Sequence, residues 1–302
     1  MSSMASVAYP HPGFLNPVPK HSLHKPLLFD LRSSCSRNLS ISAKMADPSS
    51  SPVVQIERIT VPNNYGEKLV GLLHETGSKE VVVLCHGFRA SKDHEIMRNL
   101  AGALTREGIS AVRFDFAGNG ESEGSFQYGN YQREADDLHA VVLYFLRSNR
   151  VVKAILGHSK GGNVVLLYAS RYHDVPVVVN VSGRYDLNKG IEERVGKGFI
   201  ERIKKDGFID VNGKDQYRIT EESLMDRLST DMHAACLSIE KSCRVLTVHG
   251  SEDEIIPVGD AFEFNKIIPN HKLHVIEGAD HGYTKHQVDL AKVVVEFIKA
   301  VP

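Results

Sequence analysis

A serine between two glycines, near the middle of the chain, constrains the fold more than any other feature. Residues 157–161 read Gly-His-Ser-Lys-Gly; the apolar run 151–156 precedes them, and residues 162–169 follow with helical spacing. A strand, a G-x-S-x-G sequence and a helix are the context of a nucleophile elbow, a sharp turn that projects a serine hydroxyl clear of a sheet. Glycines are needed there because larger side chains would clash with the crossing helix. The alternative reading is an ordinary serine in a glycine-rich turn.

Apolar runs alternate with amphipathic segments along residues 53–302. Continuous apolar runs such as 81–85 are typical of strands buried on both faces. We expect strands at 53–60, 69–74, 81–85, 109–115, 151–156, 175–181, 244–249 and 272–276, and helices at 92–108, 130–147, after 161, at 259–267 and at 286–300. This alternation predicts an α/β fold with a mostly parallel, eight-stranded sheet covered by helices on both faces.

One long segment interrupts the alternation. About sixty residues separate the strand ending near 181 from the strand at 244, and connections of that length are uncommon in compact domains without structure of their own. The pattern indicates a helix that ends at Gly207, a hairpin turned by Asn212-Gly213, and a helix capped by Thr220. We therefore predict a small cap over residues 184–240, inserted late in the sheet and placed over the carboxyl ends of its strands.

Two further side chains complete a chemical pattern with Ser159. A serine hydroxyl is a weak nucleophile that needs a base to take its proton, and the base needs an acid to hold its tautomer. Asp253 follows the strand at 244–249, and His281 follows the strand at 272–276. The order serine, acid, histidine is that of the α/β-hydrolase triad, and carboxyl ends of parallel strands meet at one sheet edge. Taken singly, Asp253 fits a solvated acidic loop, and His281 is one of 15 histidines.

The same logic predicts where a developing oxyanion would be held. We expect one donor to be the backbone N–H of Lys160, directly after the serine, and the other the N–H of Phe88, in the loop after the strand at 81–85. We expect His86 to bond the backbone of that loop and His158 to pack beside the elbow. The Lys160 side chain is expected to point away from the pocket, although a role in recognising substrate charge stays open.

Composition excludes several other classes. The 302 residues carry a formal net charge of −1, which gives no reason to expect nucleic acid or an anionic membrane as partner. No apolar run approaches the length of a transmembrane helix. Four scattered cysteines form neither a disulfide framework nor a zinc motif. The G-x-G at 118–120 lacks the rest of a dinucleotide fingerprint, so we predict no cofactor and no metal. The oligomeric state is left open.

Residues 1–50 differ from the rest of the chain. They are rich in serine and proline, and before Ala46 they carry one acid, Asp30, against five lysines and arginines. This composition is typical of an organellar transit peptide, and the prolines favour a plastid address over a mitochondrial one. A merely disordered tail is the alternative. Met45 is a candidate internal start that would give a cytoplasmic form. We expect residues 51–302 to form the α/β domain.

Residues 53–302 resemble the α/β-hydrolase superfamily. The resemblance rests on the sequences at 86–88, 115–124, 157–161, 249–257 and 278–283. The late cap and the run 112–116 look most like carboxylesterases of the cinnamoyl (feruloyl) esterase branch, with monoacylglycerol lipases and serine aminopeptidases as more distant relatives. The N-terminal segment suggests a plant member. Lys160 departs from the methionine that many lipases of this type carry at that position.

The resemblance and the triad together predict a cofactor-free serine esterase that acts on a small-molecule ester through an acyl-enzyme on Ser159. The cap also carries three aromatic residues that we expect to contact the substrate: Phe199, Phe208 and Tyr217. They favour a substrate with an apolar or aromatic acyl or alcohol group, for example a hydroxycinnamoyl ester. Thioesterase, lipase or peptidase chemistry would use the same parts. A different class of function is also open: a ligand receptor built on a hydrolase fold, which would bind its ligand but hydrolyse little or none of it. Epoxide hydrolases and dehalogenases are disfavoured because they carry aspartate at the elbow.

Overall fold

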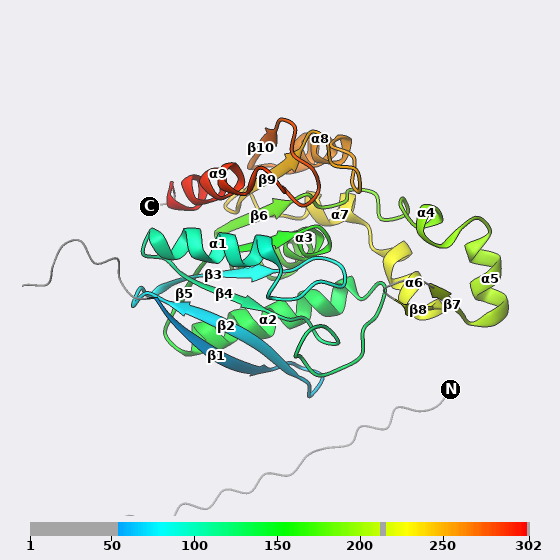
Figure 1. Ribbon diagram of the computed structural model, residues 1–302, viewed down its shortest axis with the longest axis horizontal. Coiled ribbons are helices and arrows are strands. Elements are labelled where there is room, and N and C mark those ends of the chain that lie inside the picture. The colour runs from blue at the N-terminus through cyan, green and yellow to red at the C-terminus, as the bar shows by residue number, and fades with distance from the viewer. Residues whose placement is uncertain (1–53, 212–215, 301–302) are drawn as a thin grey trace, which may run out of the picture. The chain divides into compact units, whose positions relative to one another are not determined.

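The computed structural model describes residues 54–211 and 216–300, and these form an eight-stranded sheet with helices on both faces (Figure 1). Strand β1 is antiparallel to β2 and β2 is antiparallel to β4, whereas all other neighbours in the sheet are parallel. The spatial order is β1 (Gln55–Pro62), β2 (Lys68–Glu75), β4 (Ser110–Phe114), β3 (Glu80–Cys85), β5 (Val151–His158), β6 (Val177–Val181), β9 (Arg244–Gly250) and β10 (His271–Ile276). The predicted fold class is confirmed.

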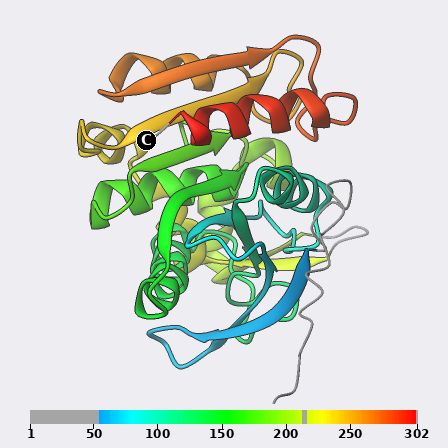
Figure 2. The same cartoon turned by 90° about the vertical axis from the view of Figure 1, so that its left-hand side faces the viewer.

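Side chains that alternate along the central strands build two separate cores. In β3, Val81, Val83 and Cys85 pack into one core, and Val82 and Leu84 pack into the other. This is the two-residue period of a strand buried on both faces. The first core is covered by α2 (Tyr131–Arg147), α3 (Lys160–Tyr172), α7 (Met232–Leu237) and α8 (Gly259–Ile267), and the second by α1 (Glu95–Arg106) and α9 (Gln287–Lys299). Figure 2 shows these layers from a second direction.

The segment between β6 and β9 carries helices and a hairpin of its own. It contains α4 (Glu192–Val195), α5 (Phe199–Asp206), β7 (Phe208–Val211), β8 (Tyr217–Thr220) and α6 (Glu221–Ser229). Gly207 ends α5 in the left-handed region, and Thr220 caps α6 through a capping box with Ser223. Figure 1 shows these elements beyond the end of the sheet toward which the parallel strands point. We call residues 191–229, from the N-cap of α4 to the end of α6, the cap; the predicted Asn212-Gly213 turn lies outside the described residues.

Several element ends differ from the sequence-based expectation for physical reasons. Helix α1 begins at Glu95 rather than at residue 92, because the Lys92 N–H donates to Asp115 and His94 acts as the N-cap. Helices α4 and α7 were not predicted, since four and six residues show too little periodicity. None of the helices in the described part of the chain is long and apolar enough to cross a membrane.

Candidate active site

The turn at Ser159 is a strained connection between β5 and α3. Ser159 has φ 56° and ψ −119°, a conformation that costs about 1–3 kcal/mol for a residue other than glycine. A Cβ at Gly157 would lie 2.0 Å from the Gly161 carbonyl oxygen, and one at Gly161 would lie 2.5 Å from the Cys85 carbonyl oxygen. The two glycines therefore let the strand, the serine and the helix approach more closely than any side chain would allow.

Ser159, His281 and Asp253 meet at the carboxyl edge of the sheet. Each follows a strand, β5, β10 and β9 respectively, and these strands run parallel. His281 Nε2 lies 3.1 Å from Ser159 Oγ, and His281 Nδ1 lies 2.8 Å from Asp253 Oδ2. Both distances are within hydrogen-bond reach, so the three side chains form a continuous chain from hydroxyl to carboxylate.

The Asp253 carboxylate is held as an anion by its surroundings. Oδ1 accepts hydrogen bonds from the N–H groups of Ile255 and Ile256 at 2.9 and 2.8 Å. His249 Nε2 lies 3.3 Å from Oδ2 and 2.8 Å from the Ile256 carbonyl oxygen. Burial opposes ionisation, but the hydrogen bonds from His249, His281 and the backbone outweigh it and hold the pKa of Asp253 well below its ordinary value. Sequence reasoning missed His249; its place in the strand directly before the acid loop was the available signal.

His158 supports the loop that carries His281. Its Nε2 donates to the His281 carbonyl oxygen at 3.0 Å, and its ring centroid lies 4.9 Å from that of His281. Burial lowers the pKa of His158 to about 3, with the nearby His281 acting in the same direction. The neutral ring therefore positions His281 without adding a second charge beside it, and the prediction that His158 packs beside the elbow is confirmed.

The loop after β3 lies against the nucleophile. A Cβ at Gly87 would be 3.1 Å from Ser159 Cβ, so the next residue, Phe88, is close to the serine. The N–H groups of Phe88 and Lys160 donate to no other residue among those described, which leaves both available to a ligand. His86 accepts from the Phe116 N–H at Nε2 and contacts the Gly87 carbonyl oxygen at 2.8 Å, so it bonds loop backbone as expected.

The Lys160 side chain is buried in an ion pair that the sequence did not reveal. Its Nζ lies 2.6 Å from Glu134 Oε1, and both side chains are only 5% exposed. Lys160 Nζ also lies 5.0 Å from the ring centroid of Tyr131. Burial raises the pKa of Glu134 to about 7, although the attraction of Lys160 opposes that rise. Glu134 comes from α2, and nothing in the local pattern indicated that it would face the elbow.

The three predicted substrate contacts lie in different surroundings. Tyr217 packs edge-on against Phe88 at a centroid distance of 5.7 Å. Phe199 is partly buried against the cap's own core. Phe208 is 39% exposed and lies under the guanidinium of Arg218 at 3.8 Å, so it faces the cap surface rather than this cluster.

Two aromatic residues that sequence reasoning missed adjoin Phe88. Phe126 and Tyr128 pack edge-on against its ring at 5.5 and 5.7 Å. Arg194 from α4 lies over the same ring at 4.5 Å. Phe88, Phe126, Tyr128 and Tyr217 therefore form an aromatic cluster beside the loop after β3, and the guanidinium groups of Arg89, Arg194 and Arg227 lie over its rings. Among residues 54–211 and 216–300, no three His, Cys, Asp or Glu side chains are grouped so that they could hold a metal ion.

Solved structures of similar fold include three hydrolases, each less than 25% identical to this chain. Est1E from Butyrivibrio proteoclasticus, solved with ferulic acid bound, is 22% identical with a TM-score of 0.68, over 80% of this chain and 98% of that one. The esterase Pf2001 from Pyrococcus furiosus is 22% identical with a TM-score of 0.63, over 82% and 91%. The α/β hydrolase GrgF from Penicillium sp. sh18 is 18% identical with a TM-score of 0.71, over 82% and 99%.

Sequence comparison agrees with the fold. A putative uncharacterized protein of Saccharomyces cerevisiae, YDL057W, is 25% identical in an alignment of 236 positions that covers 68% of this chain and 69% of that protein. A family model described as serine aminopeptidase, S33, matches residues 76–232, just over half of the chain. The matched range contains the elbow, the loop after β3 and the cap. The chain therefore belongs to the serine aminopeptidase S33 family of α/β hydrolases.

Proposed function

We propose that the protein is a serine hydrolase that cleaves carboxylic esters through an acyl-enzyme on Ser159. The observation that carries the proposal is the continuous chain of contacts from Ser159 Oγ through His281 to Asp253. A hydroxyl in hydrogen-bond reach of an imidazole, itself oriented by a buried carboxylate, is the arrangement that activates serine for attack. The strained elbow supports this assignment, because such strain persists only where the surrounding structure maintains it.

In the proposed reaction Ser159 Oγ attacks the ester carbonyl carbon while His281 Nε2 takes the hydroxyl proton. Asp253 keeps the proton of His281 on Nδ1 and stabilises the imidazolium that forms. The tetrahedral oxyanion accepts from the N–H groups of Lys160 and Phe88; in a protease, one such donor contributes about 3–4 kcal/mol. His281 then protonates the leaving alcohol oxygen as the C–O bond breaks. Water, deprotonated by His281, attacks the acyl-enzyme and releases the acid.

The aromatic cluster supports aryl esters as the substrate class. Phe88, Phe126 and Tyr217 are partly exposed, and the loop after β3 that carries Phe88 lies against Ser159. Aromatic groups favour edge-to-face contacts with such rings, and the buried ring of Tyr128 packs against Phe88. Est1E, whose structure contains ferulic acid, shares this fold. A hydroxycinnamoyl ester is accordingly the substrate we propose to test first.

The second candidate reaction is cleavage of an amino-terminal peptide bond, as the family description names it. The same serine, base and oxyanion donors would serve either reaction. An aminopeptidase must also accept a free α-ammonium group. The guanidinium of Arg194 on the ring of Phe88 opposes a second cation at that position. The ester reaction is therefore favoured over the peptidase reaction.

A labelling and turnover experiment on the full chain tests the proposal. A fluorophosphonate probe should label Ser159, and mass spectrometry should find no label in Ser159→Ala. Methyl ferulate, p-nitrophenyl butyrate and alanine p-nitroanilide would then be compared by kcat/KM. We expect repeated turnover of the two esters, with ferulate preferred, and little release of nitroaniline. Faster turnover of the anilide would establish the peptidase, and labelling without turnover on any ester would favour a ligand receptor.

We also propose that residues 1–50 direct the chain to plastids. Support comes from their serine-rich, acid-poor composition alone. A fusion of residues 1–50 to a fluorescent protein should enter plastids and be shortened there. A fusion that stays in the cytoplasm at full length would reject the proposal, and a product that begins at Met45 would support an internal start.

A further inference from the structure

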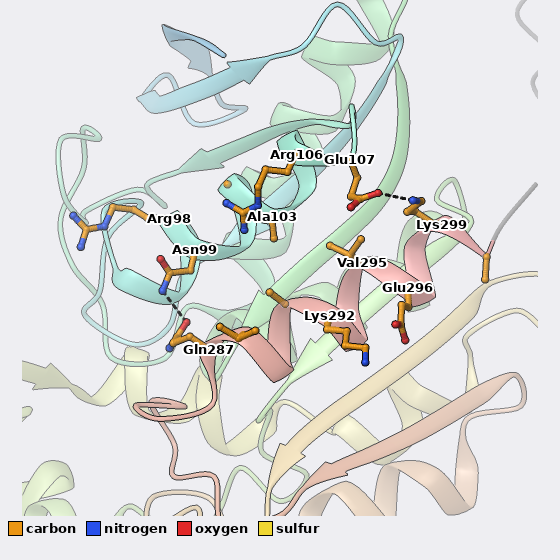
Figure 3. A pocket seen from close by; sticks show the side chains of 14 residues that line it. Arg98, Asn99, Ala103, Arg106, Glu107, Gln287, Lys292, Val295, Glu296 and Lys299 are labelled. Atoms are coloured by element: carbon orange, nitrogen blue, oxygen red, sulfur yellow. Dashed lines mark hydrogen bonds and ion pairs between the residues drawn. The ribbon is translucent and has the colours of Figure 1, made fainter. Parts of the chain in front are cut away.

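A second hollow lies away from Ser159, between α1 and α9. Its volume is about 870 Å³, and its lining contains none of the residues of the proposed triad or oxyanion site. This volume is within the roughly 300–1,000 Å³ that is typical of small-molecule sites. Figure 3 shows α1 on one side of the hollow and α9 on the other.

Small and apolar residues form the floor of this α1–α9 groove. Gly102 and Ala103 on α1 and Ala291 and Val295 on α9 all line it. A Cβ at Gly102 would meet only the Arg106 guanidinium, at 3.6 Å, so the glycine leaves open space beside that cation. Val288, at the start of α9, is 81% exposed and extends the apolar lining.

Side-chain pairs close the groove at both ends. Asn99 Nδ2 donates to Gln287 Oε1 at 3.1 Å at one end, and Lys299 forms an ion pair with Glu107 at the other. Figure 3 shows these two interactions as dashed lines at opposite ends of the hollow. From residue 99 to residue 107, the C-cap of α1, eight steps of the helix correspond to about 12 Å. A bounded hollow of this length suits a short chain molecule better than a partner helix that would have to run past both ends.

The charges around the groove are mainly positive and mainly unpaired. Arg98, Arg106 and Lys292 line it, and none of them forms an ion pair or side-chain hydrogen bond with another described residue. Two acids line the groove: Glu107 is paired with Lys299, and Glu296 forms no ion pair with another described residue. An anionic group would therefore be attracted here. A second copy placed symmetrically on the groove would bring the same cations against each other.

We propose that the α1–α9 groove binds a monoanionic amphiphile, a carboxylate with a single aliphatic chain of medium length. The chain lies along Gly102, Ala103, Ala291 and Val295, where it displaces water from apolar surface. The carboxylate meets Arg106, whose guanidinium offers several donors in one plane. This site is separate from the reaction at Ser159 and does not depend on it.

Photolabelling of the full chain tests the site. The probe is a decanoate that carries a diazirine on its chain, and unlabelled decanoate is the competitor. We expect crosslinks on peptides from α1 and α9 that the competitor removes. Arg106→Gln should weaken the competition by roughly 10-fold, because a charge-assisted hydrogen bond contributes about that much to affinity. Gly102→Leu should abolish the crosslinks by filling the floor, and Gly102→Ala, which suits a helix better than glycine, should reduce them.

Arg147→Gln is the matched control, since Arg147 occupies the last turn of α2 as Arg106 occupies the last turn of α1. It should leave labelling unchanged. Crosslinks confined to the cap and to the loops around Ser159 would overturn the proposal. So would equal competition by decanoate in the parent and in Arg106→Gln, or an equal weakening of that competition in Arg106→Gln and Arg147→Gln. Circular dichroism of each variant separates loss of binding from loss of fold.

Discussion

The buried pair between Lys160 and Glu134 offers a quantitative test of how the elbow is built. Both side chains are 5% exposed and their charged atoms lie 2.6 Å apart. Removing one partner leaves a buried charge without compensation, which costs about 3–5 kcal/mol. We therefore expect Glu134→Leu, which leaves the lysine charge unpaired, to destabilise the protein by that amount. Lys160→Met should cost less, because Glu134, whose pKa is already raised, can take up a proton. The double variant should be at least as stable as the parent.

The pH dependence of the parent's stability follows from the state of Glu134. Its pKa of about 7, against an ordinary 4.5, corresponds to about 3 kcal/mol at 1.36 kcal/mol per pKa unit. Burial thus destabilises the ionised carboxylate by more than the attraction of Lys160 stabilises it. A carboxyl whose folded pKa is raised contributes stability that is present below pH 4.5 and lost as the pH rises through 7. The double variant lacks this loss, so its stability relative to the parent should be greater at pH 8 than at pH 5.

Urea unfolding of the parent, the two single variants and the double variant at pH 8 and pH 5 measures their free energies of unfolding. Together these values form a double-mutant cycle. In thermal melts, a loss of about 3–5 kcal/mol corresponds to about 6–20 °C for a domain of this size. Circular dichroism before unfolding confirms that each variant keeps the fold. Additive effects of the two single changes, or a double variant less stable than either, would refute the pairing and with it the account of how Lys160 is anchored.

Three other changes test the remaining parts of the site. Asp253→Asn should lower kcat on the best ester by about four orders of magnitude, as the same change does in a protease triad, because it favours the wrong tautomer of His281; an effect under tenfold would contradict the assignment. His158 has a pKa of about 3 in the fold, so its contribution to stability is present above pH 6.5 and lost as the pH falls. Between pH 8 and pH 5, His158→Gln should therefore lose about 2 kcal/mol less of its unfolding free energy than the parent does, as measured by urea unfolding, and exposed His173→Asn is the matched control. Gly157→Ala places a Cβ 2.0 Å from backbone, and a melt should show a loss of about 3 kcal/mol or more; an unchanged melting temperature would mean that the elbow can widen.

Residue patterns were sufficient for the sheet because its strands are buried on both faces. The apolar runs at 81–85 and 151–156 correspond to β3 and β5, whose observed ends differ from the predicted ones by one and two residues at most. Ser159, Asp253 and His281 could be grouped because each lies just after a predicted strand, and parallel strands bring their carboxyl ends to one edge. The parallel arrangement of the strands was therefore enough to predict that the three side chains lie close together.

Side-chain partners far apart in the chain could not be predicted in this way. Glu134 and Lys160 are 26 residues apart on two helices, and helical periodicity says which face is apolar but not which polar side chain meets another. In the cap, β7 has four residues, too few for alternation to show that Phe208 faces outward while Ile209 is buried. Phe126 and Tyr128, the two aromatic neighbours of Phe88 that were missed, come from a loop without periodicity.

The cap leaves and rejoins the sheet domain between two strands, β6 and β9, that are already hydrogen-bonded neighbours. Of the six buried residues in the described part of its core, five belong to the inserted segment and one, Tyr128, to the sheet domain. The cap can therefore be exchanged as a module, and halving its length would change the entropy of closing the connection by only about 0.6 kcal/mol. In related or engineered chains, replacing residues 191–229 would change rings beside Phe88, such as Tyr217, while the elbow and the acid and histidine loops stay as they are. Arg184, whose guanidinium donates to the Ile255 carbonyl oxygen of the acid loop, would stay with them.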